Sequence, residues 1–207
     1  SEMVASEKLV QGRRDVLLRA EGRGLSPFTL QLAGREARWM AQGAKLATEA
    51  GADIIDINMG CPSRQVTGGL SGSALMRDED HAAALIAATV AATPLPVTLK
   101  MRLGWDHNSL NAPRLACIAE YLGVAMITVH GRTRCQFYKG SADWRAIRAV
   151  VEAVRVPVIA NGDISDGSSA RTALKHSSAA GIMVGRAAVG RPWLLAQIQS
   201  YLESKIW

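Results

Sequence analysis

Two basic residues stand at the end of an apolar segment where they could hold an anion. Lys100 and Arg102 alternate along the chain, so their side chains share one face if the segment is a strand. Residues 97–101 are otherwise almost wholly apolar, and lysine is almost never buried unpaired. We therefore expect either an anionic partner for a buried Lys100 or a strand-end lysine that reaches solvent.

Two further apolar segments end in residues suited to binding phosphate. Asn161-Gly162-Asp163 follows one segment and Gly185-Arg186 follows another, each just before a stretch of helical pattern. Glycine lets the backbone approach a ligand closely, and helix N-termini favour phosphate. These segments predict a phosphate site, with ordinary turn glycines as the alternative.

A cysteine and a histidine complete the candidate chemistry. Cys61 lies between two turn-forming residues after an apolar run, where a thiol can be an acid, a nucleophile or an inert core residue. The glycine-rich stretch 67–73 that follows is expected to be a flexible lid. His130 ends another apolar run and is either a site residue or a structural hydrogen-bonding histidine.

The elements that must position these residues alternate between two patterns. Short runs rich in Val, Ile, Leu or Met are typical of parallel strands buried on both faces. They are predicted at residues 27–33, 53–59, 96–101, 125–130, 157–161 and 181–185. Helical patterns separate them at residues 36–50, 80–92, 112–122, 143–154, 166–175 and 192–203, and Asp166 is a candidate N-cap.

Strands alternating with helices indicate a parallel sheet, either an open doubly wound sheet or a closed barrel. A possible seventh strand at residues 1–5, followed by a helix near residues 7–19, leaves a closed barrel one strand short of eight. In both folds ligands bind at the carboxyl ends of the strands, where the polar residues above stand. In barrels a phosphate site often follows strands seven and eight, which matches Gly162 and Gly185 if the first strand is missing.

Composition excludes several classes of protein. Hydrophobic residues make up 48% of the 207 residues, which excludes a disordered chain. No apolar run approaches the roughly 20 residues of a membrane span, and we expect no signal peptide, because the first residues lack a basic start and a long apolar stretch. Three widely spaced cysteines favour neither disulfides nor a zinc site, so we expect a cytoplasmic protein without metal or membrane.

The net charge of +6 is compatible with RNA as a partner. Arg132, Arg134 and Lys139, with Tyr138 and Trp144 among them, could grip a phosphate backbone or form a solvated face. An aromatic content of 5% argues against a stacking surface for single strands.

The order of the motifs resembles a known family over almost the whole chain. The carrying segments are Asn-Met-Gly-Cys-Pro at 58–62, Gly-Ser-Ala-Leu-Met at 72–76, Val-His-Gly-Arg-Thr-Arg at 129–134, Ile-Ala-Asn-Gly-Asp-Ile at 159–164 and Val-Gly-Arg at 184–186. Together they resemble the tRNA-dihydrouridine synthases, most closely the bacterial B-type subgroup.

The resemblance implies an FMN-containing (β/α)8 TIM barrel that uses NADPH to reduce uridine in tRNA to 5,6-dihydrouridine. Cys61 would donate a proton to uracil C5 while the reduced flavin delivers hydride to C6; a free thiol is mostly protonated at neutral pH, as a donor must be. Asn58 and Arg102 would meet the target base, and Arg132 and Arg134 would contact the RNA. The implied cofactor residues are Gln31, Lys100 and His130 at the flavin ring, and Asn161, Gly162, Asp163, Gly185 and Arg186 at the ribityl phosphate.

We expect residues 1–207 to form one FMN-binding barrel domain that lacks its first strand. The helical tRNA-binding domain of the family is expected to be absent or to begin only after about residue 200. Two other functions stay open: an inactive or non-catalytic remnant that binds phosphate or RNA, and another FMN-dependent barrel reductase that acts on a small molecule. Flavin retention tests the first, and reduction of a free pyrimidine but not of tRNA would favour the second.

Overall fold

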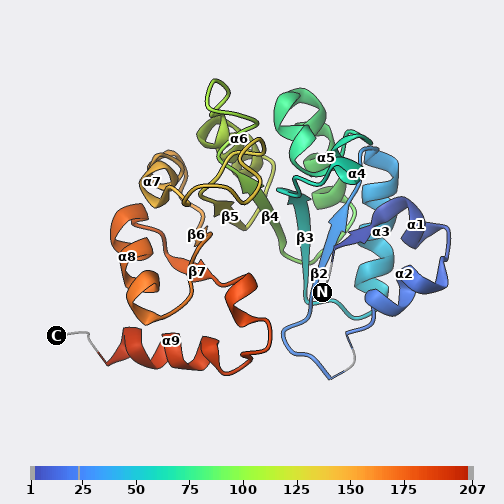
Figure 1. Ribbon diagram of the computed structural model, residues 1–207. Helices are drawn as coiled ribbons and strands as arrows, with labels where there is room; N and C mark the ends of the chain where they lie inside the picture. The colour runs from blue at the N-terminus through green and yellow to red at the C-terminus, as the bar shows by residue number, and fades with distance from the viewer. Residues whose placement is uncertain (1–2, 23, 205–207) are drawn as a thin grey trace.

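The sheet is one curved layer of parallel strands that follow one another in chain order. The computed structural model describes residues 3–22 and 24–204, and within this part each strand pairs with its neighbours in sequence (Figure 1). The strands are β1 (Val4–Ala5), β2 (Thr29–Ala33), β3 (Ile54–Met59), β4 (Val97–Arg102), β5 (Met126–His130), β6 (Val158–Asn161) and β7 (Gly181–Met183).

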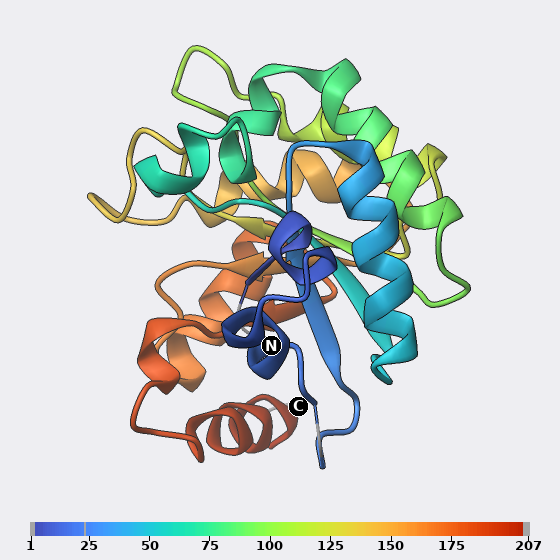
Figure 2. The same ribbon diagram turned by 90° about the vertical axis from the view of Figure 1, so that its right-hand side faces the viewer.

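Strand order decides between the two folds that the sequence left open. A doubly wound sheet reverses its order at a switch point, whereas this order never reverses. Because crossovers between parallel strands are right-handed, an order that always advances puts the helices on one face. Figures 1 and 2 show them on the outer side of the curved sheet. The fold is therefore a partial TIM barrel, as predicted.

Local sequence patterns mark where helices begin and end. The side chain of Asp166 accepts a hydrogen bond from Ser169 N, and Ser169 Oγ bonds back to the Asp166 backbone, which confirms the predicted N-cap as a capping box. The helices are α1 (Ser6–Val10), α2 (Arg14–Arg19), α3 (Ala37–Glu49), α4 (Arg64–Thr67), α5 (Glu79–Ala91), α6 (Ala112–Tyr121), α7 (Trp144–Ala153), α8 (Gly167–Ser177) and α9 (Leu194–Glu203), with 3-10 turns η1 (Gly72–Arg77) and η2 (Arg186–Ala188).

One expectation about the N-terminal half needs correction. The single helix expected near residues 7–19 is two helices, because Gly12 adopts a φ of +70° that breaks the helix between them. In the stretch 67–73, Thr67, Gly72 and Ser73 are buried while Gly68 and Leu70 are exposed, and the flexible lid stays a prediction. The expected strand at residues 1–5 is present at Val4–Ala5, while residues 1 and 2 lie outside the described residues.

The two faces of the sheet differ in chemistry. Side chains alternate along each strand, so one set of residues points outward to the helices and the other points inward. The outward set, which includes Leu30, Ile57, Leu99 and Val129, belongs to the main hydrophobic core. The inward set is mostly polar and includes Gln31, Asp56, Asn58, Thr98, Lys100, Arg102, Thr128, His130 and Asn161, while Ile54, Ile159 and Met183 share this face. Strands β3 to β5 are largely buried on both faces, as predicted, whereas β7 is half-buried, and the outer face is the more apolar one.

Replacing Leu99 with Ala tests the position of this core. Leu99 is 0% exposed between Ile57 and Ile127 of the neighbouring strands, so the substitution is expected to lower the free energy of unfolding by about 2–5 kcal/mol. Leu110→Ala, at a position that is 51% exposed, is the matched control and should change it by about 0.5 kcal/mol or less. Urea unfolding followed by circular dichroism measures both, and equal losses would contradict this placement.

Candidate active site

A cavity of about 530 Å³ opens at the carboxyl ends of β4 to β7. It brings together every expected cofactor residue except Gln31, although these residues come from three strands, β4 to β6, and from the loops after β6 and β7. Its lining is Lys100, His130, Tyr138, Asn161, Gly162, Asp163, Ile164, Ser165, Met183, Gly185, Arg186 and Ala187. We call it the rim cavity.

Lys100 brings a partly buried positive charge to the rim cavity. Its Nζ donates to Oδ1 of Asn161 at 3.3 Å, and Nδ2 of Asn161 donates to the Met183 carbonyl at 2.9 Å. Burial lowers the pKa of Lys100, and the negative charge of Asp56 counteracts this effect. Asp56 therefore supplies the negative charge that we expected near a buried Lys100.

His130 is held in one neutral form. Arg132 Nη1 lies 3.3 Å from Nε2 of His130, and because a guanidinium only donates hydrogen bonds, Nε2 must accept and the ring proton must reside on Nδ1. The side chain is buried, and burial together with the positive charges of Arg102, Lys100 and Arg132 lowers its pKa to about 3. At neutral pH His130 is therefore an uncharged donor through Nδ1.

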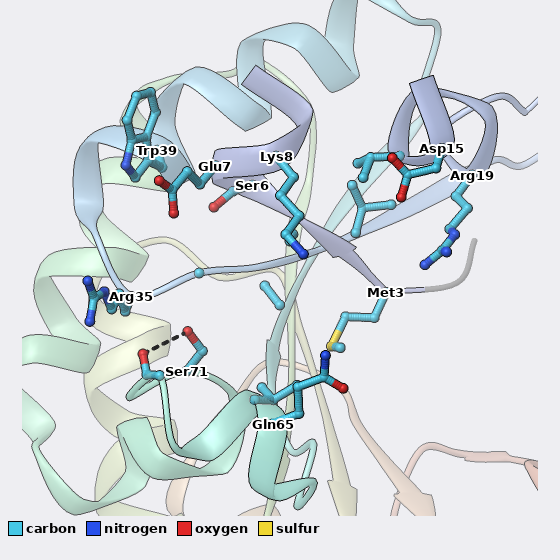
Figure 3. Close-up of a pocket in the computed structure, with 17 residues that line it drawn as sticks. Met3, Ser6, Glu7, Lys8, Asp15, Arg19, Arg35, Trp39, Gln65 and Ser71 are labelled. Carbon is cyan, nitrogen blue, oxygen red and sulfur yellow. Dashed lines mark hydrogen bonds between the residues drawn. The ribbon is translucent and has the colours of Figure 1, made fainter. Parts of the chain in front are cut away.

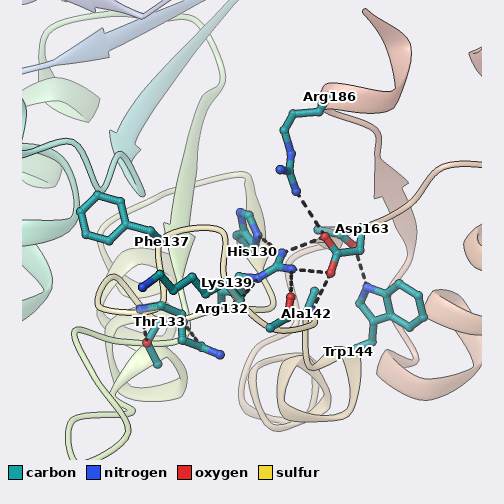
Figure 4. Close-up of polar contacts among 12 residues, drawn as sticks. His130, Arg132, Thr133, Phe137, Lys139, Ala142, Trp144, Asp163 and Arg186 are labelled. Atoms are coloured by element: carbon teal, nitrogen blue, oxygen red, sulfur yellow. Dashed lines mark hydrogen bonds and ion pairs between the residues drawn. The ribbon is translucent and has the colours of Figure 1, made fainter.

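An ion-pair cluster joins the loops that follow β5, β6 and β7 (Figure 4). Arg132 donates to both carboxylate oxygens of Asp163, at 2.9 and 2.6 Å, and the Ala142 N–H donates to the same carboxylate. Partial burial alone would raise the pKa of Asp163, but these hydrogen bonds outweigh it, so the pKa lies below its ordinary value. Arg186 lies 3.5 Å from Asp163 with a side chain that is 67% exposed.

The loops after β5 and β6 can pack closely because residue 162 is a glycine. Its φ is +113°, and a Cβ atom there would lie 2.8 Å from Cβ of Ala142 and 2.9 Å from Cδ2 of His130. Only glycine fits both the backbone conformation and the space. Trp144 Nε1 donates to the Gly162 carbonyl at 2.8 Å and holds the loop in place (Figure 4).

Cys61 lies on a turn that is held from both sides. The Oδ1 atom of Asn58 accepts hydrogen bonds from the N–H groups of Gly60 and Cys61, at 3.2 and 3.0 Å. The Cys61 carbonyl accepts from N and Oγ of Ser73, at 3.1 and 2.8 Å. The thiol belongs to a half-buried residue at the carboxyl end of β3, and its backbone is fixed.

The arginines expected to contact RNA are largely engaged by the protein itself. Arg102 is 2% exposed and donates to the carbonyls of Gly60, Thr133 and Phe137; burial lowers its pKa to about 10. Arg132 is equally buried against Asp163. Arg134 stacks on the rings of Trp105 and Phe137 and donates to Thr67 Oγ1. Arg132 is thus too buried to form the phosphate grip or solvated face that the sequence suggested, and both Arg132 and Arg134 join loops to one another.

A larger cavity, of about 680 Å³, lies at the β1 edge of the sheet, between α1, α2 and the α4 turn (Figure 3). Its lining mixes acidic and basic side chains, and none of the residues expected to do chemistry is among them. In the part of the chain that the structure describes, Ser6 Oγ and Trp39 Nε1 are buried without a hydrogen-bond partner. The candidate site is therefore the smaller rim cavity, where the expected residues converge.

Sequence patterns assigned no role to Thr98 or Ser73. Thr98 donates a hydrogen bond to Asp56, and Ser73 donates one to the Cys61 carbonyl. Thr98 stands two residues before Lys100 on the same strand, so period-two alternation could have placed both on the inner face. Ser73 had no comparable signal, because it reaches Cys61 only through the fold.

Among residues 3–22 and 24–204, no group of three or more His, Cys, Asp or Glu side chains could hold a metal ion. No helix there is long and apolar enough to span a bilayer.

Comparisons with known proteins show the family of the chain. The family model described as "Dihydrouridine synthase (Dus)" matches residues 1–207. A "Probable tRNA-dihydrouridine synthase" of Rhodobacter capsulatus is 60% identical over 99% of this chain and 64% of its own length, and one of Rhizobium leguminosarum is 58% identical over 93% and 61%. The "tRNA-dihydrouridine synthase B" of Pseudomonas putida is 45% identical over 99% and 61%. The chain thus spans less than two thirds of the length of these curated relatives, and it belongs to the dihydrouridine synthase family.

Proposed function

We propose that the rim cavity binds FMN and that the chain is the catalytic domain of a tRNA-dihydrouridine synthase driven by NADPH. The observation that carries the proposal is the convergence of Lys100, His130, Asn161 and Arg186 on one cavity, at the same rim as the Cys61 turn. The names of the relatives and the net charge of +6 support tRNA as the substrate.

The chemistry of the rim cavity fits FMN. A flavin mononucleotide needs a positive charge beside its ring and a second one at its phosphate, and Lys100 and Arg186 line the same cavity. A Cβ atom built on Gly185 would meet nothing within 4 Å, so the backbone there is open to a phosphate group. When bound, FMN would supply the hydride for uracil C6, with NADPH as the source of electrons.

The residues of the chain then have separate tasks. The Lys100 ammonium stabilises negative charge at the cofactor ring, and the neutral His130 donates a hydrogen bond from Nδ1 without adding charge. The exposed Arg186 guanidinium is available for a bidentate contact with phosphate. Cys61 donates the proton that uracil C5 requires, from a backbone that Asn58 and Ser73 hold in place.

Lys100→Met tests the cofactor assignment. We expect the purified chain to bind FMN, and the variant to bind it at least about tenfold more weakly, because an ammonium beside the ring is lost. Lys45→Met, at an exposed position on α3, is the control and should bind as the wild type does. Flavin fluorescence in a titration measures the dissociation constants; equal values for both variants would contradict the role of Lys100.

Cys61→Ala tests the proton donor. The variant should retain FMN affinity but lose uridine reduction by about 10²–10⁴-fold, the usual contribution of a general acid. Cys135→Ala, an exposed cysteine, is the matched control. Dihydrouridine is quantified after incubation of unmodified tRNA with NADPH and the whole protein. Turnover of Cys61→Ala at the control rate would remove this role, and reduction of free uracil but not of tRNA would favour a small-molecule reductase.

His130→Asn tests the neutral histidine. Because the folded pKa of about 3 lies below the ordinary value, the unfolded chain binds the extra proton as pH falls below about 6.5, and the wild type loses stability. The destabilisation caused by His130→Asn should therefore be about 2 kcal/mol smaller at pH 5 than at pH 7. Urea unfolding at both pH values measures it, with the exposed His107→Asn as control. A pH-independent difference would mean that His130 titrates normally.

A further inference from the structure

One buried carboxylate begins a chain of hydrogen bonds that runs across the inner face of the sheet. Asp56 of β3 lies between Gln31 of β2 and Thr98 of β4 in the strand register. Its Oδ2 accepts a hydrogen bond from Nε2 of Gln31 at 2.5 Å, and its Oδ1 accepts one from Oγ1 of Thr98 at 2.6 Å. Both carboxylate oxygens of Asp56 thus have a donor on a neighbouring strand.

The direction of this chain follows from the carboxylate. An ionised carboxylate only accepts hydrogen bonds, so the amide nitrogen of Gln31 must face Asp56 and its Oε1 must face away. That oxygen accepts from Nδ2 of Asn58 at 2.8 Å. The Oδ1 atom of Asn58 consequently faces the turn, where it accepts from the N–H of Cys61 at 3.0 Å. Turning either amide over would bring donor against donor and acceptor against acceptor.

The same carboxylate is also linked electrostatically to the rim cavity. Asp56 and Lys100 stand on the same face of the adjacent strands β3 and β4, with Lys100 opposite Asn58 in the register. Burial penalises the charged form of Lys100, and the negative charge of Asp56 favours it. Burial raises the pKa of Asp56 itself, and the hydrogen bonds from Thr98 and Gln31, together with the charge of Lys100, counteract that rise. These three partners favour the charged form of Asp56 against its burial, and the two hydrogen bonds that its oxygens accept set the direction of the chain.

We propose that Asp56 is a positioning residue that acts in two ways: its hydrogen bonds orient Gln31 and Asn58 and thereby hold the Cys61 turn, and its carboxylate, on the inner face that also carries Lys100, stabilises the ammonium that would meet the cofactor. The proposal rests on the proposed function for the roles of Cys61 and Lys100. It assigns to Asp56 no contact with substrate or cofactor.

Two substitutions separate the two actions. Asp56→Asn keeps a carbonyl oxygen for Gln31 and turns its NH2 group to Thr98 Oγ1, which can accept, so the direction survives while the charge is lost. Asp56→Leu removes both. Thr89→Val is the control: Thr89 is equally buried and its Oγ1 donates to the Leu85 carbonyl at 2.7 Å, but it lies on α5, outside the sheet.

The first readout is the rate at which iodoacetamide alkylates Cys61, in a background where Cys117 and Cys135 are Ala. This rate needs neither FMN nor tRNA. Asp56→Leu should raise it by about threefold or more, because the released turn opens more often. Asp56→Asn should restore a rate close to that of the wild type, and Thr89→Val should not change it.

The second readouts are FMN affinity and the kinetics of uridine reduction by the whole protein. Asp56→Asn should weaken FMN binding by about tenfold, because the Lys100 ammonium then lacks a stabilising negative charge. Asp56→Leu should lower kcat by about 10- to 100-fold with little change in KM for tRNA, the pattern of a misplaced catalytic group.

The outcomes distinguish this proposal from the proposed function. Alkylation that Asp56→Leu leaves unchanged, or that Asp56→Asn fails to restore, overturns the positioning role even if the wild type reduces tRNA. Alkylation that depends on Asp56 in a protein that binds no FMN supports the positioning role and removes the proposed function. If Asp56→Leu does not fold, Thr98→Val, which removes one hydrogen bond to Asp56, should raise the alkylation rate, and an unchanged rate would overturn the proposal.

Discussion

Asp56 is buried and Lys100 half-buried on the inner face of the sheet, where neither charge is stable without partners. Burying one isolated charge costs several kcal/mol, so each must be compensated by opposite charge and by hydrogen bonds. Thr98, Gln31 and Asn161 supply the bonds, and the two charges favour each other. The polar inner face is therefore a connected network, and the positions of its members depend on one another.

Buried arginines extend this network to the loops above the strands. Arg102 joins the turn after β3 to the loop after β5, and Arg132 joins that loop to Asp163 after β6. A planar guanidinium with several donors can satisfy several carbonyls or both oxygens of one carboxylate, which an ammonium cannot do in the same geometry. The rim loops thereby behave as one scaffold, and the exposed Arg186 is the member whose charge faces outward.

The alternation of the strands separates stability from chemistry. The outward residues form the apolar core with the helices and account for the burial that stabilises the fold. The inward residues contribute little apolar burial and are available for binding a cofactor. A scaffold of this kind can hold the Cys61 turn and the rim cavity on the same side of the sheet, because every parallel strand ends at that side.

The amino-acid sequence by itself determined the strands, most of the longer helices, their alternation and the rim at which Lys100, His130, Gly162 and Gly185 stand, because these follow from local periodicity, turn residues and the common direction of parallel strands. The family resemblance was also visible in the motifs around Cys61 and His130. Only the tertiary structure decided the strand order that excludes a doubly wound sheet, the engagement of Arg102 and Arg132 by neighbouring loops, and the directed chain from Asp56 to Cys61. Some of the residues in those features are dozens of positions apart in the sequence. Their side-chain partners depend on strand register and loop packing, which no local pattern encodes.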